Sequence, residues 1–223
     1  MSYTGWITLS IALVAAAVPS GSLAWDLCYD GSVLPNDPSL GTGTWSVPYG
    51  QDPSPCSSDG DILHIPASGM SYYRHAIPFG APVTLEARFR VTSAIAWRYA
   101  WLGAGTPSFM TSAELYTDKA VSYVYGGALT YPADLTLFHT LRIATASTGD
   151  SFLWLDGQLI AEGLALPGCQ VGISFGSQPA VDSYWDYVAY SADFLPVPEP
   201  SSLAALGFAI AGLAMAAARR KRR

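Results

Sequence analysis

Residues 138–162 read FHTLRIATASTGDSFLWLDGQLIAE, and this stretch gives the clearest indication of how the chain folds. Apolar segments alternate with two turn signals, Thr148-Gly149-Asp150 and Asp156-Gly157. Asp-Gly between two apolar segments is a strong signal for a tight β-hairpin, because such turns need a positive φ. The stretch therefore predicts three consecutive antiparallel strands, over residues 138–144, 151–155 and 158–162.

The chain from Asp61 onward repeats this pattern of short strands separated by turn residues. The clearest strand is Pro82–Val91, which is apolar on one face and polar on the other. Glu86 and Arg88 share its polar face, and we expect them to form a solvated charge pair. Further strands are predicted over residues 62–65, 72–77, 98–102, 113–116, 121–125, 171–175 and 184–190. No amphipathic helix of useful length appears, so the predicted fold class is all-β, a two-sheet antiparallel sandwich.

Four motifs in this region carry a family resemblance. They are Phe138–Ile143, Phe152–Gly157, Ile173-Ser174-Phe175-Gly176 and Asp186-Tyr187-Val188. In this order they resemble the concanavalin A-like, laminin-G-type sandwich, in which an Asp-Gly hairpin precedes a Phe-Gly strand and an Asp-Tyr-Val terminal strand. The resemblance covers most of residues 60–192 and, more weakly, 25–59. It implies a jelly-roll domain, to which we assign residues 25–195; a different β-sandwich is the alternative.

The C-terminus combines a rigid polar hinge, an apolar segment and a basic end. Pro198-Glu199-Pro200 precedes Ser201–Ala218, which contains no charged residue. A helix over these residues would be about 27 Å long, which suits a bilayer core of about 30 Å. The cluster Arg219, Arg220, Lys221, Arg222 and Arg223 favours the cytoplasmic side. We predict a transmembrane helix over residues 201–218. The segment could alternatively be an ordinary single-span tail with no sorting role, or a buried core helix of a soluble domain.

Residues 196–223 resemble the PEP-CTERM sorting signal of Gram-negative bacteria. The resemblance implies recognition by an exosortase, a membrane-embedded protease, with the membrane as a partner during sorting. It also implies removal of the tail near Pro198-Glu199-Pro200, followed by release or attachment of the body at the cell surface or in the extracellular matrix. Exopolysaccharide production is associated with this system.

The N-terminus agrees with export. Ile7–Val18 is mostly apolar, and the small residues Ser22 and Ala24 suit cleavage by signal peptidase between Ala24 and Trp25. We therefore predict a signal peptide over residues 1–24. Because no Lys or Arg precedes the apolar segment, an uncleaved anchor is the alternative. Both alternatives place the body outside the cytoplasm.

The charge of the body differs from that of the whole chain. Of 17 carboxylates only Glu199 lies outside residues 25–195, and five of the 11 cations form the tail. The body therefore holds 16 carboxylates against six cations, a net charge of −10. This balance argues against nucleic acid as a partner, whose binding needs Lys and Arg, and against anionic glycans. Neutral sugars and divalent cations remain as candidate ligands.

Three cysteines fall in the body. Cys28 and Cys56 bracket a loop-rich segment, and in an oxidising compartment they are a candidate disulfide. Pairing of Cys169 with either of them, or three free thiols, are the alternatives. No Cys/His spacing supports a zinc site, and we predict no cofactor. The turn residues Asp59, Asp61, Asp150 and Asp182 are weak candidates for Ca²⁺ ligands.

The chain lacks the catalytic pattern of glucanases that share the fold it resembles. Those enzymes carry Glu-x-Asp-x-Glu on one strand, and none of the body's glutamates (Glu86, Glu114, Glu162) has a carboxylate two residues away. Asp182 and Asp186 have an even spacing, but we interpret them as structural. Gly172–Gly176 fits Gly-x-Ser-x-Gly, yet Ser174 falls inside a predicted strand and no His follows it. His64, His75 and His139 have no catalytic spacing, and His139 is interpreted as a packed sheet residue. We predict no catalytic residue.

Aromatic residues offer a simpler function, because their rings stack on sugars. Trp97, Tyr99 and Trp101 alternate and are predicted to share one strand face, and a second cluster is formed by Tyr184, Trp185 and Tyr187. Core packing is the alternative for both groups. The sequence favours an exported, noncatalytic surface or matrix protein that binds glycan or exopolysaccharide. The alternatives are a divergent glycoside hydrolase or lyase, and a purely structural coat protein.

Overall fold

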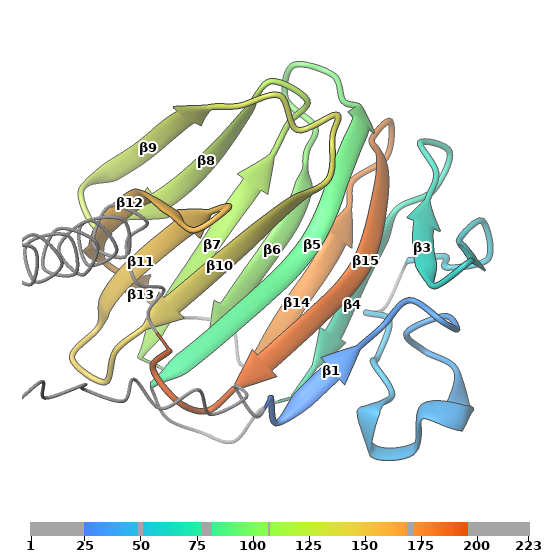
Figure 1. Ribbon diagram of the computed structural model, residues 1–223, viewed down its shortest axis with the longest axis horizontal. Coiled ribbons are helices and arrows are strands. Elements are labelled where there is room, and N and C mark those ends of the chain that lie inside the picture. The colour runs from blue at the N-terminus through green and yellow to red at the C-terminus, as the bar shows by residue number, and fades with distance from the viewer. Residues whose placement is uncertain (1–24, 49–50, 77–81, 107, 169–171, 196–223) are drawn as a thin grey trace, which may run out of the picture.

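The computed structural model describes residues 25–48, 51–76, 82–106, 108–168 and 172–195. These residues form two antiparallel β-sheets packed face to face, as the sequence predicted. Figure 1 shows β5, β10 and β15 in one layer and β6, β7 and β14 in the other. No helix in the described ranges is long and apolar enough to cross a bilayer. The predicted signal peptide (1–24) and the predicted membrane helix (201–218) with its basic end lie outside them.

The first sheet, here called sheet A, has eight strands in the order β12-β11-β10-β5-β15-β3-β2, with β1 also paired to β15. Its strands are β1 (Leu27–Tyr29), β2 (Ser57–Asp59), β3 (Ile62–Ile65), β5 (Val83–Ser93), β10 (His139–Thr145), β11 (Asp150–Leu155), β12 (Gln158–Leu164) and β15 (Asp182–Ser191).

The second sheet, sheet B, has seven strands in the order β4-β14-β6-β7-β8-β9, with β13 also paired to β7. Its strands are β4 (Ser71–His75), β6 (Ala100–Gly105), β7 (Phe109–Leu115), β8 (Lys119–Val124), β9 (Gly127–Pro132), β13 (Leu166–Pro167) and β14 (Gly172–Ser177). A short 3₁₀ segment that is kinked at Gly41, η1 (Pro38–Gly43), precedes β2, and Asp37 caps it by accepting a hydrogen bond from the Ser39 amide.

The three strands predicted from residues 138–162 are β10, β11 and β12, paired in that order. Asp156 and Gly157 both have positive φ, 50° and 78°, as a tight hairpin turn requires. The Asp156 carboxylate also accepts a hydrogen bond from the Thr140 amide and contacts His139 Nδ1 at 2.6 Å. The turn is therefore fixed by its backbone conformation and by side-chain bonds to the neighbouring strand.

The core lies between the sheets and is built from the alternate residues of their facing strands. Phe175 of β14 lies at its centre, with Trp45 at 5.0 Å and Trp185 at 5.1 Å between ring centroids. Tyr29 and Tyr73 pack against the same ring. Because these aromatic residues come from both sheets and from the N-terminal loop, one cluster closes the sandwich.

The outer face of sheet A carries a partly buried polar network. Arg142 donates to the Glu86 carboxylate at 2.7 Å, and the Tyr187 hydroxyl donates to it at 2.8 Å. The predicted charge pair of Glu86 with Arg88 is therefore wrong, and Arg88 instead pairs with Asp186. Cross-strand neighbours lie closer than residues two apart on one strand, which explains this choice of partners.

The described ends of the chain meet on this same sheet. The Asp26 carboxylate accepts a hydrogen bond from the Ala192 amide at 2.6 Å. Arg142 donates to the Leu195 carbonyl at 3.2 Å, and its guanidinium lies 5.5 Å from the Trp25 ring. The described chain thus ends on sheet A, directly before the predicted sorting motif.

The candidate disulfide between Cys28 and Cys56 is not present, and neither cysteine is bonded to another within the described residues. Cys28 lies on the exposed face of β1, whereas Cys56 is buried and contacts Ser71 Oγ at 3.3 Å. The two side chains belong to different environments, one facing solvent and one facing the interior. Cys169 lies outside the described residues, so the alternative pairings stay open.

Candidate functional site

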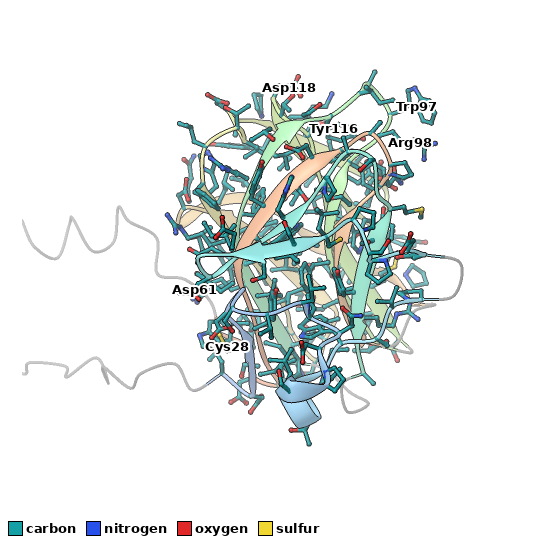
Figure 2. The ribbon with its side chains drawn as sticks, turned by 90° about the vertical axis from the view of Figure 1, so that its right-hand side faces the viewer. Cys28, Asp61, Trp97, Arg98, Tyr116 and Asp118 are labelled. Atoms are coloured by element: carbon teal, nitrogen blue, oxygen red, sulfur yellow. The ribbon has the colours of Figure 1, made fainter. Side chains whose placement is uncertain are left out.

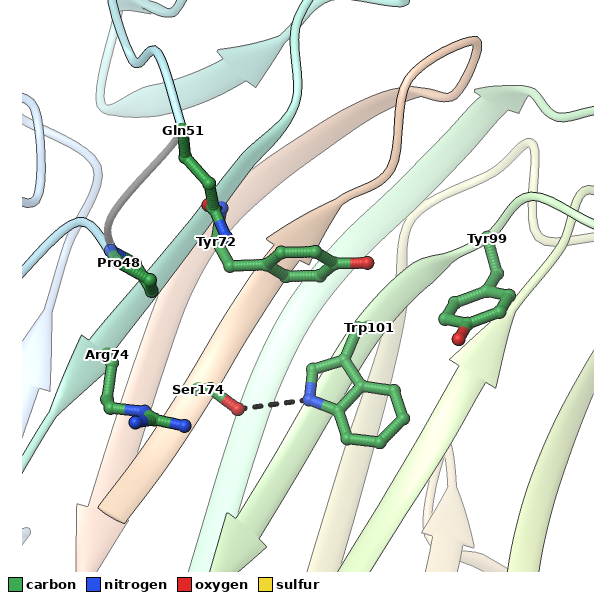
Figure 3. A pocket seen from close by; sticks show the side chains of 7 residues that line it. All are labelled: Pro48, Gln51, Tyr72, Arg74, Tyr99, Trp101 and Ser174. Atoms are coloured by element: carbon green, nitrogen blue, oxygen red, sulfur yellow. Dashed lines mark hydrogen bonds between the residues drawn. The ribbon is translucent and has the colours of Figure 1, made fainter. Parts of the chain in front are cut away.

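A groove crosses the outer face of sheet B, with a volume of about 310 Å³ (Figure 3). Three aromatic rings, one cation and smaller polar groups line it. These residues, here called the sheet B groove, are Pro48, Gln51, Tyr72, Arg74, Tyr99, Trp101 and Ser174. They come from β4, β14 and β6, from the segment between η1 and β2 (Pro48 and Gln51) and from the turn before β6 (Tyr99).

Strand register brings the groove residues together. Tyr72, Gly176 and Trp101 form one row across β4, β14 and β6. Arg74, Ser174 and Gly103 form the next row. Residues two apart on a strand share a face, so both rows project outward, away from the core.

Glycine and serine give the groove its floor. A Cβ atom at Gly103 would lie 2.9 Å from Trp101 Nε1, so only glycine lets the indole take its position there. Trp101 Nε1 donates a hydrogen bond to Ser174 Oγ at 3.0 Å, as Figure 3 shows. The indole N–H is thus satisfied within the protein, and the ring is held in one orientation.

The Gly-x-Ser-x-Gly pattern of residues 172–176 is explained by strand packing and by the groove floor. Gly172, Ser174 and Gly176 alternate along β14 and all lie on its outer face. Ser174 Oγ accepts from tryptophan, and no described histidine bonds to it. A Cβ at Gly172 or Gly176 would clash with the backbone carbonyl oxygen of His75 or Ser71 on β4, so these glycines allow β14 to pair closely with β4. The pattern is therefore structural and does not form a nucleophile elbow.

The three aromatic residues predicted to share a strand face are only partly grouped. Tyr99 and Trp101 lie 6.2 Å apart between ring centroids, and Tyr116 lies 5.9 Å beyond Tyr99. Trp97, however, lies in the turn before β6 and is 65% exposed, with the Arg98 guanidinium 4.3 Å from its ring (Figure 2). The strand begins at Ala100, so the alternation does not extend back to Trp97.

A carboxylate lies beside this aromatic row. Glu114 of β7 is opposite Trp101 in the register and is only 8% exposed. Its Oε2 accepts hydrogen bonds from the hydroxyls of Tyr116, at 2.9 Å, and Tyr123, at 3.1 Å. Among the strands that the structure describes in sheet B, Glu114 is the sole acidic residue.

The tyrosines around Glu114 are neutral donors over the physiological range. Burial is the largest cause and raises the pKa of Tyr99, Tyr116 and Tyr123, and the Glu114 carboxylate raises it further. Burial also raises the pKa of Tyr72. The groove therefore presents phenol hydroxyls, aromatic ring faces and one guanidinium.

The second predicted aromatic cluster is wrong. Tyr184 and Trp185 are adjacent on β15 and so project from opposite faces of sheet A. Trp185 is fully buried in the core, where its Nε1 donates to Ser183 Oγ at 3.0 Å. Tyr184 lies on the outer face and stacks on His64, with centroids 4.4 Å apart.

Asp182 and Asp186 also lie on sheet A and have separate partners. Asp182 accepts from Thr92 Oγ1 at 2.5 Å and contacts His64 Nε2 at 2.7 Å, whereas Asp186 pairs with Arg88. Burial alone would raise the pKa of Asp182, but the hydrogen bonds from Thr92 and His64 outweigh it and hold the pKa below its usual value. Both carboxylates lie on sheet A, in the layer opposite the groove. Each is engaged by neighbouring side chains in a structural role.

His139 and the candidate Ca²⁺ ligands lie apart from the groove residues. His139 contacts Asp156 through Nδ1 at 2.6 Å and the Asp134 carbonyl through Nε2 at 2.8 Å, which fits a structural role at the start of β10. Within the described ranges no three acidic, His or Cys side chains gather as a metal site would require. This includes the candidate ligands Asp59, Asp61, Asp150 and Asp182.

Sequence comparison identifies the C-terminal segment. Residues 196–223 match the PEP-CTERM protein-sorting motif. Comparison with curated proteins finds no significant match. The chain therefore carries this sorting motif, as its residues predicted, and the motif indicates export and membrane-anchored sorting by an exosortase.

Several solved structures share the fold of the body. A glycosyl hydrolase family 16 protein from Mycobacterium smegmatis superposes with a TM-score of 0.54 at 15% identity, covering 75% of this chain and 100% of that one. A prokaryotic β-1,3-1,4-glucanase from a mouse hindgut metagenome gives 0.50 at 16% identity, covering 67% and 93%. The metal-free Emp46p carbohydrate recognition domain gives 0.50 at 12% identity, covering 78% and 100%. These likenesses show the fold, a two-sheet jelly-roll sandwich, which is consistent with the concanavalin A-like body that the sequence motifs predicted.

Most of the groove residues could not be predicted as site residues from the sequence. Tyr99 and Trp101 were found because their spacing is local. Tyr72, Arg74 and Ser174 join them only through the pairing of β4, β14 and β6. Trp101 and Ser174, for example, are 73 residues apart in the sequence. Glu114 was noted only as a glutamate without a neighbouring carboxylate.

Proposed function

We propose that the exported domain is a noncatalytic glycan-binding module and that the sheet B groove is its binding site. The observation that supports this most strongly is the fixed indole of Trp101, beside Tyr72 and Tyr99 in an open groove. Aromatic faces stack on the C–H surfaces of sugars, and a few convergent polar groups then orient the hydroxyls. Arg74, Gln51 and the tyrosine hydroxyls supply such groups without any metal or cofactor.

The acidic side chains favour binding over hydrolysis. Retaining glycosidases place two carboxyl groups about 5 Å apart, and inverting ones roughly 6.5–9.5 Å apart. In sheet B the described strands offer Glu114 alone, and its Oε2 already accepts from two tyrosine hydroxyls. A single carboxylate engaged in this way lacks the partner that glycoside hydrolysis requires.

Binding is tested with Trp101→Ala and the matched control Trp97→Ala, in the full-length chain held in detergent micelles. The ligands are the exopolysaccharide of the producing cell and a panel of neutral and acidic oligosaccharides. We expect Trp101→Ala to lower affinity about tenfold or more, since aromatic contacts add roughly 0.5–1.5 kcal/mol beyond area burial. Trp97→Ala should bind as the wild type does. No binding to any of these glycans would overturn the proposal and favour a structural coat protein.

A divergent glycoside hydrolase or lyase acting on exopolysaccharide is the second candidate. It is favoured by one observation, the position of Glu114 next to Trp101 in the register. Release of reducing ends or of unsaturated sugars from the cell's own polysaccharide, abolished by Glu114→Gln, would support it. Absence of turnover by a chain that binds the same polymer would exclude it.

We further propose that the domain acts at the cell surface or in the extracellular matrix after exosortase processing. Trp25 and Leu195, the two described ends, both contact Arg142 on sheet A. The groove is on the outer face of sheet B. A domain held through either end would therefore have its groove in the layer away from the attachment.

A further inference from the structure

Arg74 differs from every other cation of the domain. Arg88 and Arg142 pair with carboxylates, and the remaining charges lie over aromatic rings: Arg90 over Tyr184, Arg98 over Trp97 and Lys119 over Tyr116. Arg74 has neither kind of partner among the residues that the structure describes. Its Nε, like that of Arg90, is buried and makes no hydrogen bond there, although a buried N–H group normally finds an acceptor. Unlike Arg90, Arg74 has no aromatic ring beneath its guanidinium within the described residues.

The fold holds Arg74 firmly in the groove. Its backbone pairs with Ser174 on one side and exchanges hydrogen bonds with Ser46 on the other, at 2.8 and 2.9 Å. Figure 3 shows the guanidinium directed toward Ser174, whose hydroxyl also accepts from the Trp101 indole. A fixed cation and a fixed aromatic ring thus flank the same serine.

The acidic residue of sheet B is remote from this cation. Arg74 is on β4 and Glu114 on β7, three strands away in the sheet order β4-β14-β6-β7. Three strand spacings amount to about 14 Å, which exceeds a Debye length of about 8 Å at physiological salt. The Glu114 carboxylate is moreover hydrogen-bonded by Tyr116 and Tyr123. No carboxylate of the described sheet B strands therefore lies close to Arg74, although the whole domain has a net charge of −10.

We propose that the sheet B groove is selective for acidic polysaccharides, and that Arg74 binds the carboxylate of a uronic acid while a sugar ring stacks on Trp101. This inference rests on the proposed glycan-binding function and adds the class of ligand. A guanidinium presents paired N–H donors that match the geometry of a carboxylate, whereas a neutral sugar leaves its charge without a partner. The whole-domain charge, which argued against anionic glycans, is outweighed at short range by this unpaired cation.

The test uses two probes that differ only in charge: hexagalacturonate and its carboxyl-reduced form, with calorimetry on the full-length chain in detergent micelles. The variants are Arg74→Gln, Arg74→Lys and Trp101→Ala, with Arg98→Gln as the matched control because Arg98 lies outside the groove. We expect wild type and Arg98→Gln to prefer hexagalacturonate. Loss of a charge-assisted hydrogen bond in Arg74→Gln should weaken hexagalacturonate binding about ten- to a hundred-fold and leave the reduced form within about twofold. Arg74→Lys should recover part of the loss.

The outcomes separate the two proposals. Equal wild-type affinity for both probes, or an equal effect of Arg74→Gln on both, would overturn the acidic selectivity. The glycan-binding proposal would still stand in that case if Trp101→Ala weakened binding of both probes. Failure of the wild type to bind either probe, the cell's own exopolysaccharide or the wider panel would overturn glycan binding itself. Far-UV circular dichroism and the unfolding temperature of each variant distinguish loss of contact from loss of fold.

Discussion

Trp101 owes its position to two neighbours that have little chemistry of their own. Gly103 leaves room for the indole ring, and Ser174 accepts its N–H at 3.0 Å. Both lie on the outer face of sheet B, in the row next to Trp101. At the scale of single residues, the shape of the groove thus depends on small side chains at defined register positions.

Gly103→Ala tests this dependence. The added Cβ would lie 2.9 Å from Trp101 Nε1, so the indole must move and its hydrogen bond to Ser174 is lost. We expect a shift in tryptophan emission, weaker glycan binding and a loss of unfolding free energy of about 0.5–1.5 kcal/mol. Gly127→Ala is the control, since a Cβ there meets nothing within 4 Å. Unchanged emission and affinity in Gly103→Ala would contradict this account of the groove floor.

Asp182 provides a residue-scale prediction for pH. Its folded pKa lies below the usual value of 3.8, with burial opposed by hydrogen bonds from Thr92 and His64. The folded state therefore holds this proton less tightly than the unfolded state. The resulting stability is present above pH 3.8 and is lost as the pH falls through the lower folded pKa.

Asp182→Asn should accordingly reduce stability near neutral pH and flatten its acid dependence. We expect the difference in unfolding temperature between wild type and Asp182→Asn to shrink as the pH is lowered from 6 toward 3. Asp118→Asn, at an exposed turn position, is the control. A difference that is constant across this pH range would show that the carboxylate charge contributes nothing there.

At the scale of elements, the hairpin between β11 and β12 organises the edge of sheet A. Gly157 has φ 78°, a left-handed conformation that a Cβ disfavours. The preceding Asp156 joins the turn to β10 through Thr140 and His139. The turn therefore links three strands, although it contributes only two residues to the loop.

Gly157→Ala should lower the unfolding free energy by about 1–2 kcal/mol, because an L-residue pays that much in the left-handed region. Urea unfolding measures the change. Gly43→Ala is the matched control, since its added Cβ would make only ordinary contacts with Leu27 and Leu40. Equal stability of the two variants would show that the hairpin tolerates a side chain at this position.

The elements also show where sequence patterns stop being informative. Alternation found β3 and β5, whose inner residues are buried and whose outer residues are mostly polar or half-buried. The turn signals that flank β10 and β11 indicated those strands, whose outer faces also hold the buried residues Ala144 and Trp154. Alternation missed β9, which is exposed on almost every residue and therefore has no alternation. It also missed β1, β2 and β13, which are only two or three residues long.

At the scale of the whole molecule, the proposed binding groove and the described C-terminal end, Leu195, lie on opposite sheets. The sheet B groove faces outward from one sheet, and Leu195 ends the described chain on the other, bonded to Arg142 and Thr84. The sorting motif follows directly, over residues 196–223. Cleavage near Pro198-Glu199-Pro200 would therefore leave the groove residues untouched.

Processing can be measured directly on the exported protein. We expect mass spectrometry of the mature chain to give a C-terminus near Pro198-Glu199-Pro200 and an N-terminus at Trp25. A strain lacking its exosortase is the control, and there the basic residues Arg219–Arg223 should be retained. Finding those residues in the exported wild-type chain would contradict removal of the tail and favour a permanent anchor.

The sequence alone established the sorting motif, the all-β class and the central hairpin, because each is encoded by residues close together in the chain. Tertiary structure alone decided that Glu86 pairs with Arg142, that His64 meets Asp182, and that Trp185 is buried while Trp101 lines a groove. These contacts depend on strand order and register, which join residues as far as 118 positions apart. The same holds for Arg74: net charge is a sum over the sequence, whereas the charge that a ligand meets depends on which side chains the fold leaves without partners.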